Sequence, residues 1–187
     1  MPKVASTFLQ QEVFPKMKDV KFYKKHHFNK YQELNNSDLN GKYLFSSEKD
    51  RGMVEEAKKI NKKFPNAQII LLFRKHQDWI LSRYKYYIRK HGYKPFHKFI
   101  DIEKNKGLWK TEELQYRKKI KSIEAIFGSQ PHVFLFKDLK SKPDKFVKEL
   151  LDITNTTEIE EINAHKRVNK AFSKKQLIVL RKYNEYY

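Results

Sequence analysis

Two short, almost uninterrupted apolar runs stand out along the chain, at Gln68 to Phe73 (QIILLF) and His132 to Phe136 (HVFLF). Proline or polar turn residues flank each run, which is typical of a buried β-strand. Strands that are apolar at consecutive positions need cover on both faces, so these runs favour a parallel sheet between helices. Two further strands are predicted at Lys42 to Phe45 and Val20 to Tyr23.

Helical patterns lie between these strands. Glu48 to Phe64 carries apolar residues at helical spacing and ends before Pro65, so we expect a helix that joins two parallel strands. A second helical stripe precedes Gly92 and comprises Ile80, Tyr84, Tyr87 and Ile88. The other predicted helices cover about residues 95–104, 111–127, 144–153 and 173 onward. This alternation predicts an α/β fold of three layers, with helices on both sides of a mainly parallel sheet, in one domain of residues 1–187.

Composition narrows the function classes. The chain has 187 residues, of which 39% are hydrophobic, and this suits one domain with its own core. A net charge of +19 favours anionic partners, although a solvated lysine-rich surface accounts for part of the excess. The absence of cysteine excludes disulfides, thiolate metal sites and cysteine nucleophiles. No apolar run is long enough to span a membrane, so we expect a soluble, cytoplasmic protein.

The first candidate site lies in the opening segment, Pro2 to Gln10. Lys3, small residues and the adjacent hydroxyls of Ser6 and Thr7 precede a helical run, a composition that can surround a phosphate. An ordinary helix N-cap has the same residues. The segment also lacks the glycine-rich Lys-Ser/Thr form of the ATP-binding loop, which counts against a nucleoside-phosphate kinase.

The second candidate site follows the most apolar strand. Arg74 comes directly after the strand, and Ser82 lies eight residues later on the following helix, so both side chains can reach one phosphate. In an open parallel sheet, ligands bind beyond the carboxyl ends of the strands. Arginines at strand ends are also common partners in ordinary ion pairs.

These two segments, in this order, resemble the sulfotransferases that use 3'-phosphoadenosine 5'-phosphosulfate (PAPS). Members of that family open with Pro-Lys-x-x-x-Thr for the 5'-phosphosulfate and continue with an Arg, and a Ser eight residues later, for the 3'-phosphate. The matching residues are Pro2, Lys3, Ser6, Thr7, Arg74 and Ser82. The subgroup that the chain resembles is bacterial and carbohydrate-type, and its pattern is fitted by Phe8, Leu9, Gln10, Gln77 and Tyr84.

The resemblance continues to the end of the chain. Four later segments are similar to those of the family: the strand at His132, the acidic-Leu turn at residues 137–139, the helix at 144–153 and an Asn-Lys-Ser-like loop at 168–173. The resemblance implies a P-loop NTPase-like sulfotransferase fold. One departure is that the family's opening loop follows a central strand, whereas Met1 stands directly before Pro2. We therefore expect the usual first strand to be missing, unless the start lies upstream, the sequence is truncated or another strand takes its place. Loss of that strand leaves neighbouring edges unpaired.

The resemblance also assigns roles to residues. Lys3 neutralises charge on the bridging oxygen, and the loop that holds the 5'-phosphate comprises Lys3, Val4, Ala5, Ser6 and Thr7, with Ala5 in place of the common Gly. Arg74 and Ser82 hold the 3'-phosphate, and Lys166, Arg167 and Asn169 close over the nucleotide. PAPS is the co-substrate, PAP is its product, and no metal is needed because positioning and charge neutralisation carry the transfer.

Deprotonation of the acceptor hydroxyl requires a base. Glu48, just beyond the predicted strand Lys42 to Phe45, occupies the family's usual position for this base. The alternative is that Ser46 or Ser47 caps the next helix and Glu48 only favours its positive end. His26 and His27 are further candidates.

The acceptor is expected to be carbohydrate-like, either a saccharide or a glycolipid. A sugar ring could stack on aromatic residues, although such residues more often form core, and the candidates are Trp79, Tyr86, Tyr87, Tyr93 and Phe96. A basic nucleic-acid or polyanion-binding protein, in the form of an inactive sulfotransferase relative, is the alternative function. Nucleic-acid binding explains the charge but not the paired anion-binding turns.

Overall fold

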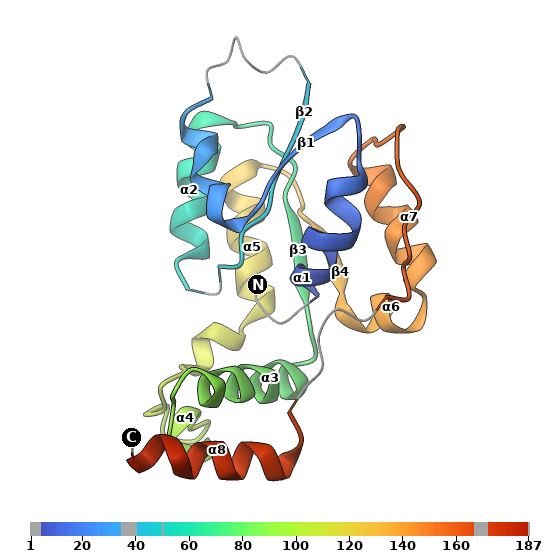
Figure 1. Cartoon of the computed structure of the whole chain (residues 1–187). Coiled ribbons are helices and arrows are strands. Elements are labelled where there is room, and N and C mark those ends of the chain that lie inside the picture. The colour runs from blue at the N-terminus through green and yellow to red at the C-terminus, as the bar shows by residue number, and fades with distance from the viewer. Residues whose placement is uncertain (1–4, 35–40, 50, 167–171, 187) are drawn as a thin grey trace.

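The computed structural model describes residues 5–34, 41–49, 51–166 and 172–186, and it combines helices with parallel strands (Figure 1). The strands are β1 (Val20–Tyr23), β2 (Lys42–Phe45), β3 (Ile70–Phe73) and β4 (His132–Leu135). Two of them coincide with the predicted ranges, and β3 and β4 are slightly shorter than predicted. Mixed α/β architecture is therefore confirmed.

The expected single sheet is replaced by two separate pairs of strands. β1 pairs with β2 and β3 pairs with β4, both in parallel, with Val20 opposite Lys42 and Ile70 opposite His132. Within the described ranges, no strand lies between the two pairs, so hydrogen bonding cannot continue from one pair to the other. In Figure 1 the strands run toward α3, which places their carboxyl ends on that side of the molecule.

Helices connect and cover the strands. The first described element is a helical segment made of α1 (Ser6–Phe8), a π-helix (Leu9–Val13) and a 3-10 turn (Phe14–Lys16), which we call the N-terminal helical segment. The later helices are α2 (Met53–Lys63), α3 (His76–Arg89), α4 (Phe96–Phe99), α5 (Tyr116–Phe127), α6 (Phe136–Ser141), α7 (Pro143–Ile153) and α8 (Lys174–Tyr186). Two 3-10 helices cover Lys25–Gln32 and Thr111–Leu114.

Two helix predictions and one turn prediction were wrong in part. The helix expected from Glu48 begins only at Met53, and the one expected over residues 95–104 is reduced to Phe96–Phe99. Asp101 ends the latter, because its carboxylate accepts a 2.9 Å hydrogen bond from Lys104 N and so competes with helical bonding. The turn expected at residues 137–139 is instead part of α6.

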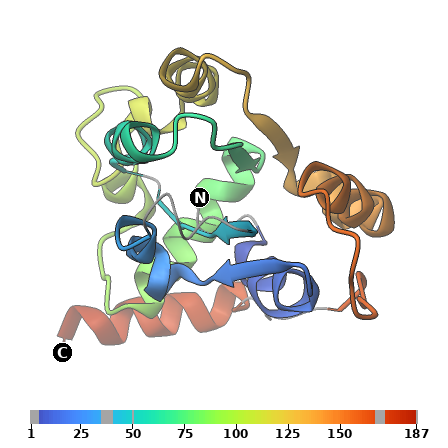
Figure 2. The ribbon, with the colours of Figure 1, turned by 90° about the horizontal axis from the view of Figure 1, so that it is seen from above.

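The core joins the two strand pairs through the N-terminal helical segment. Phe8, Leu9, Val13 and Phe14 of that segment pack in one cluster with side chains from all four strands, including Phe22, Leu44, Leu72 and Phe134. On the other face of β3, Leu71 and Phe73 pack with Ala57 of α2 and Ile123 of α5. Figure 2 shows α5 and the N-terminal helical segment on opposite sides of β3, so the strands lie between two helical layers.

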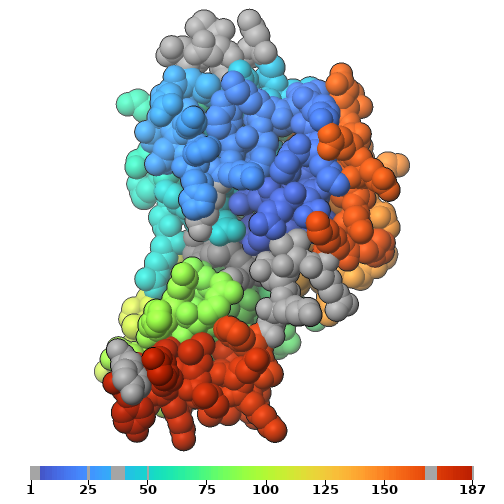
Figure 3. All heavy atoms as spheres, viewed as in Figure 1, coloured from blue at the N-terminus to red at the C-terminus, as the bar shows by residue number. Residues whose placement is uncertain are grey.

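A further body lies beyond the carboxyl ends of the strands. It comprises α3, α4, the chain up to residue 110, and α8, and we call residues 76–110 and 172–186 the α3/α8 layer (Figures 1 and 3). Its core holds Trp79, Ile80, Phe99, Ile100 and Trp109. The candidate residues at the strand ends therefore face this layer.

Asp19 ties the start of β1 to the chain near the end of α7. Its Oδ2 accepts hydrogen bonds from Lys42 Nζ at 2.7 Å and from Thr157 N and Oγ1 at 3.0 Å each. The hydrogen bond from Lys42, followed by the one from the Thr157 amide, holds the pKa of Asp19 well below its ordinary value.

Replacing Asp19 by asparagine is therefore expected to lower the melting temperature at pH 7. A depressed folded-state pKa means that the stabilisation is complete above the unfolded-state pKa of about 3.9 and is lost as the pH falls toward the folded-state pKa. The difference in melting temperature between wild type and Asp19→Asn should thus shrink below about pH 4. Melting curves across this range test it, with the exposed Asp152→Asn as control; a difference that stays constant down to acid pH would contradict it.

Candidate anion-binding and catalytic site

The first turn of the N-terminal helical segment meets the carboxyl end of β2. Ser6 Oγ donates a 2.5 Å hydrogen bond to Glu48 Oε1, although 42 positions separate the two residues. One helical turn further on, Gln10 Nε2 donates to Ser46 Oγ at 2.9 Å. A residue expected in the donor loop and the residue expected to act as base are therefore in direct contact.

Ala5 leads the chain into α1 with a left-handed backbone, at φ 73° and ψ 10°. In this conformation a Cβ crowds the following carbonyl, which costs roughly 1 kcal/mol for residues other than glycine. A left-handed residue beside right-handed ones turns successive N–H groups toward one concave side, which is a geometry that binds anions. The backbone at Ala5 thus explains why glycine suits this position, and it supports an anion-binding role for the loop.

Glu48 does not lie in a helix. α2 begins at Met53 after Gly52, which has a left-handed φ of 69°, so neither Ser46 nor Ser47 caps this helix. The interpretation of Glu48 as a residue of a capped first turn is therefore excluded. Its side chain is half-buried and points instead to the N-terminal helical segment through Ser6.

A neighbouring network holds the segment that carries Glu48. Lys49 Nζ donates to the carboxylate of Glu56, which also accepts a 2.8 Å hydrogen bond from Tyr31 Oη. Burial opposes ionisation of Glu56, but these hydrogen bonds outweigh it and keep the pKa of Glu56 below its ordinary value. The ionised carboxylate thus anchors the chain one residue beyond Glu48.

Arg74 follows the last residue of β3, as the sequence predicted. Its guanidinium lies 4.6 Å from the centre of the Phe136 ring, at the end of β4. Burial lowers the pKa of Arg74, while the nearby carboxylate of Asp78 opposes this shift. An arginine stays protonated under such conditions, so the carboxyl ends of β3 and β4 carry a half-buried positive charge.

The other residues predicted to bind the sulfuryl donor lie on helices, contact the N-terminal helical segment, or fall outside the described part of the chain. Ser82 is half-buried on α3, six residues after that helix begins, and Thr7 is half-buried in α1. Lys166 Nζ forms a 2.8 Å ion pair with Glu12 of the N-terminal helical segment, which brings the later chain against the opening segment. Four predicted site residues lie outside the described part of the chain: Lys3, Val4, Arg167 and Asn169.

Sequence reasoning missed an aromatic stack beside Arg74. The rings of Phe73, Tyr116 and His76 lie face to face, with centroids 4.3 Å and 4.2 Å apart, and Tyr116 Oη donates to the carbonyl of Arg74 at 3.0 Å. His76 Nε2 also lies 2.6 Å from the carbonyl of Leu114. The only signal for this stack in the sequence was the aromatic Tyr116 directly after the polar residues that end at Gln115.

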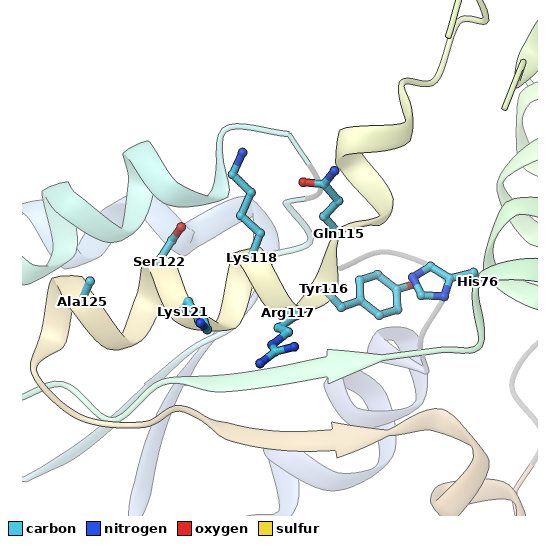
Figure 4. A pocket seen from close by; sticks show the side chains of 8 residues that line it. All are labelled: His76, Gln115, Tyr116, Arg117, Lys118, Lys121, Ser122 and Ala125. Carbon is cyan, nitrogen blue, oxygen red and sulfur yellow. The ribbon is translucent and has the colours of Figure 1, made fainter. Parts of the chain in front are cut away.

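The stack borders an open depression of about 710 Å³. It is lined by His76, Gln115, Tyr116, Arg117, Lys118, Lys121, Ser122 and Ala125 (Figure 4). In the close-up, Lys118 and Ser122 point away from the strands, whereas Arg117 points toward them. The depression therefore offers cations and an aromatic edge next to the arginine at the end of β3.

The other candidates have clear positions. His26 and His27 are exposed on the 3-10 helix Lys25–Gln32. Trp79 is 1% exposed and belongs to the core of the α3/α8 layer, whereas Tyr93 and Phe96 are 48% and 44% exposed. Among the described residues, no group of three or more His, Asp or Glu side chains could hold a metal ion, and no helix is long and apolar enough to cross a membrane.

Fold and geometry together define an α/β protein with a left-handed turn at Ala5, a carboxylate at the end of β2 and an arginine at the end of β3. The sulfotransferase family model matches residues 3–160, which include all of these features, so the chain belongs to the sulfotransferase family. Family membership makes it a transferase of sulfuryl groups. Among curated proteins and among solved structures, no significant match was found.

Proposed function

We propose that the protein transfers the sulfuryl group of PAPS to a hydroxyl of a carbohydrate-like acceptor, in a P-loop-like sulfotransferase fold. The observation that carries the proposal is the contact between Ser6 Oγ and Glu48 Oε1 at 2.5 Å. It joins the proposed donor loop to the proposed base, so the sulfuryl group and the acceptor hydroxyl would meet at one point.

The chain offers suitable groups for the donor. The turn at Ala5 and the hydroxyls of Ser6 and Thr7 would bind the 5'-phosphosulfate, with Lys3 beside them. Arg74 and Ser82 would bind the 3'-phosphate, the group that distinguishes PAPS from ATP, because a half-buried guanidinium forms strong paired hydrogen bonds to phosphate. Lys166, Arg167 and Asn169 would close over the nucleotide from the later chain, and Lys166 already contacts the N-terminal helical segment.

The chemistry requires a proton acceptor near the attacking hydroxyl. In a loose in-line displacement, the protein positions the reactants and stabilises charge. A carboxylate would take the proton of the hydroxyl as the new O–S bond forms, while the bond between sulfur and the bridging oxygen of PAPS breaks and PAP leaves. Glu48 would fill this role, and the hydrogen bond from Ser6 and the anchored neighbour Lys49 would fix its orientation. No metal is part of this scheme.

Binding of PAP, the desulfated donor product, tests the proposal. PAP at about 100 times its Kd should stabilise the protein by about 2.7 kcal/mol, which corresponds to a rise of roughly 5–11 °C in melting temperature. Arg74→Ala should abolish the rise, measured from the variant's own melting temperature. Arg89→Ala removes an exposed cation from the last turn of α3, the helix that follows Arg74, and should keep the rise.

ATP and a DNA oligomer, tested in parallel, decide between the alternatives. A response to PAP alone that depends on Arg74 would support the donor site. Equal responses to all three ligands, or equal losses in both arginine variants, would instead indicate a general polyanion binder and overturn the proposed donor.

A further inference from the structure

Large apolar side chains are exposed mainly on one part of the molecule. Of those in the described residues that are well exposed, only Val133, Leu135 and Ile159 lie outside the α3/α8 layer. The others are Leu81, Tyr93, Phe96, Ile102, Leu108, Phe172, Ile178, Val179, Tyr183 and Tyr186. Where such side chains adjoin one another, as they can along one helix, they often mark a binding surface.

α8 has two different faces. Leu177, Leu180 and Asn184 recur at helical spacing and pack inward, and Asn184, 8% exposed, donates to the carbonyls of Ile88 at 2.7 Å and Gly92 at 3.0 Å. The inward face is therefore fixed to α3. In Figures 1 and 2, α8 lies at the edge of the molecule. The side chains on the other face of the helix are exposed.

The outward face combines apolar groups with cations. It consists of Lys175, Val179, Lys182, Tyr183 and Tyr186, which recur at the spacing of one helical face. Val179 and Tyr186 are 68% and 81% exposed, and Ile178 beside them is 45% exposed. α8 lies outside residues 3–160, the range that the family model matches, so the match to the family does not account for this face.

We propose that this outward face of α8 docks onto an anionic membrane surface. Helices with an apolar stripe and flanking lysines lie in the headgroup region, where the apolar side chains reach the acyl boundary and the ammonium groups meet lipid phosphates. Tyrosine suits the same interface because its ring is apolar and its hydroxyl is polar.

Other partners fit the face less well. A nucleic acid attracts the lysines but gains nothing from the aliphatic Val179 and Ile178. A second copy of the chain would bring the same lysines, and a net charge of +19 on each molecule, against each other. Of these three partners, an anionic lipid surface is the one that is complementary to both the charge and the aliphatic groups.

Docking would have a direct consequence for the acceptor. The carboxyl ends of the strands face the α3/α8 layer (Figure 1), so a membrane at α8 lies on the side of the molecule toward which β2 and β3 run. Glu48 and Arg74 follow these two strands in the chain. Resting on the proposed function, this arrangement favours a lipid-linked saccharide over a free one as acceptor. The docking itself does not depend on the reaction.

Vesicle flotation of the full chain tests the proposal without any activity measurement. The protein should float with vesicles of phosphatidylcholine that contain about 30% phosphatidylglycerol and remain unbound with phosphatidylcholine alone. Val179→Lys is the decisive variant, because it adds a charge but removes an apolar group. We expect it to weaken vesicle binding roughly two- to threefold, since the loss of a buried valine, about tenfold in partition, outweighs the roughly fivefold gain from one more lysine near anionic headgroups.

Paired charge reversals provide the control. Lys182→Glu should weaken vesicle binding about tenfold or more, whereas Lys145→Glu, an equal charge change at an exposed position of α7, should have little effect. All variants should keep the wild-type melting temperature, because the changed side chains are exposed. The proposal is overturned if Val179→Lys binds vesicles as well as wild type does, or if Lys182→Glu and Lys145→Glu have the same effect. It is also overturned if a single-stranded oligonucleotide binds with the same dependence on Lys182 and binds Val179→Lys more tightly than wild type. Failure of flotation together with retained PAP binding would overturn docking alone.

Discussion

Replacing Glu48 by glutamine is expected to lower kcat for sulfuryl transfer by about 10²–10⁴-fold while PAP binding stays intact. Glutamine keeps the size of the side chain and an oxygen that can accept the hydrogen bond from Ser6, so the local geometry should survive. What it removes is the ability to take the proton of the acceptor hydroxyl. Initial rates with labelled PAPS and a panel of saccharide and glycolipid acceptors would measure the loss.

The controls separate catalysis from folding and charge. Glu160→Gln removes a carboxylate of the same type, 54% exposed and paired with Lys18, and should leave kcat unchanged. A thermal shift with PAP should be the same for wild type and Glu48→Gln. If Glu48→Gln turned over normally, the base would have to be another group and the interpretation of the Ser6 contact would be wrong.

Replacing Trp79 by alanine should have the largest effect on stability. Trp79 is 1% exposed, and its ring packs edge-on against Trp109 with centroids 5.2 Å apart. Truncation of a buried tryptophan leaves a cavity and typically costs about 3–5 kcal/mol. For a chain of this size, the melting temperature should fall by roughly 6–20 °C.

Leu81→Ala is the matched control on the same helix. Leu81 is 47% exposed, so its truncation should change stability by no more than about 0.5 kcal/mol. Chemical denaturation of both variants gives the two free energies of unfolding. Similar losses for both would show that the core of the α3/α8 layer does not pack around Trp79.

Local sequence patterns were sufficient to predict where the strands and most of the helices lie. Lys42–Phe45 and Val20–Tyr23 were predicted with the observed bounds, because short β-branched and aromatic runs between turn residues are a strong local signal. The late start of α2 was not predictable in this way. Its cause is long-range: Ser46 and Glu48 are held by Gln10 and Ser6, which keep the segment out of the helix.

The pairing of the strands was also beyond the sequence. Hydrophobic runs indicate that strands are buried, but they do not specify which strands are neighbours, and the structure divides them into two pairs. Likewise, Ser6 and Glu48 were each chosen from local motifs and family resemblance, yet nothing in the sequence indicated that they touch. The stack of His76 on Tyr116 joins residues 40 positions apart and has no local signature.

The separation of the two strand pairs has a consequence for the order in which the chain acquires structure during synthesis. Ile70 pairs with His132, so β3 emerges from the ribosome about 60 residues before its partner, roughly 3–12 s earlier at ordinary elongation rates. β1 and β2 can pair well before that moment. During this interval β3 is an unpaired apolar strand on a nascent chain, with the N-terminal helical segment already available to shield its Ile70 and Leu72 face. That segment would then serve the growing polypeptide as an internal chaperone before it serves the finished protein as part of a binding site.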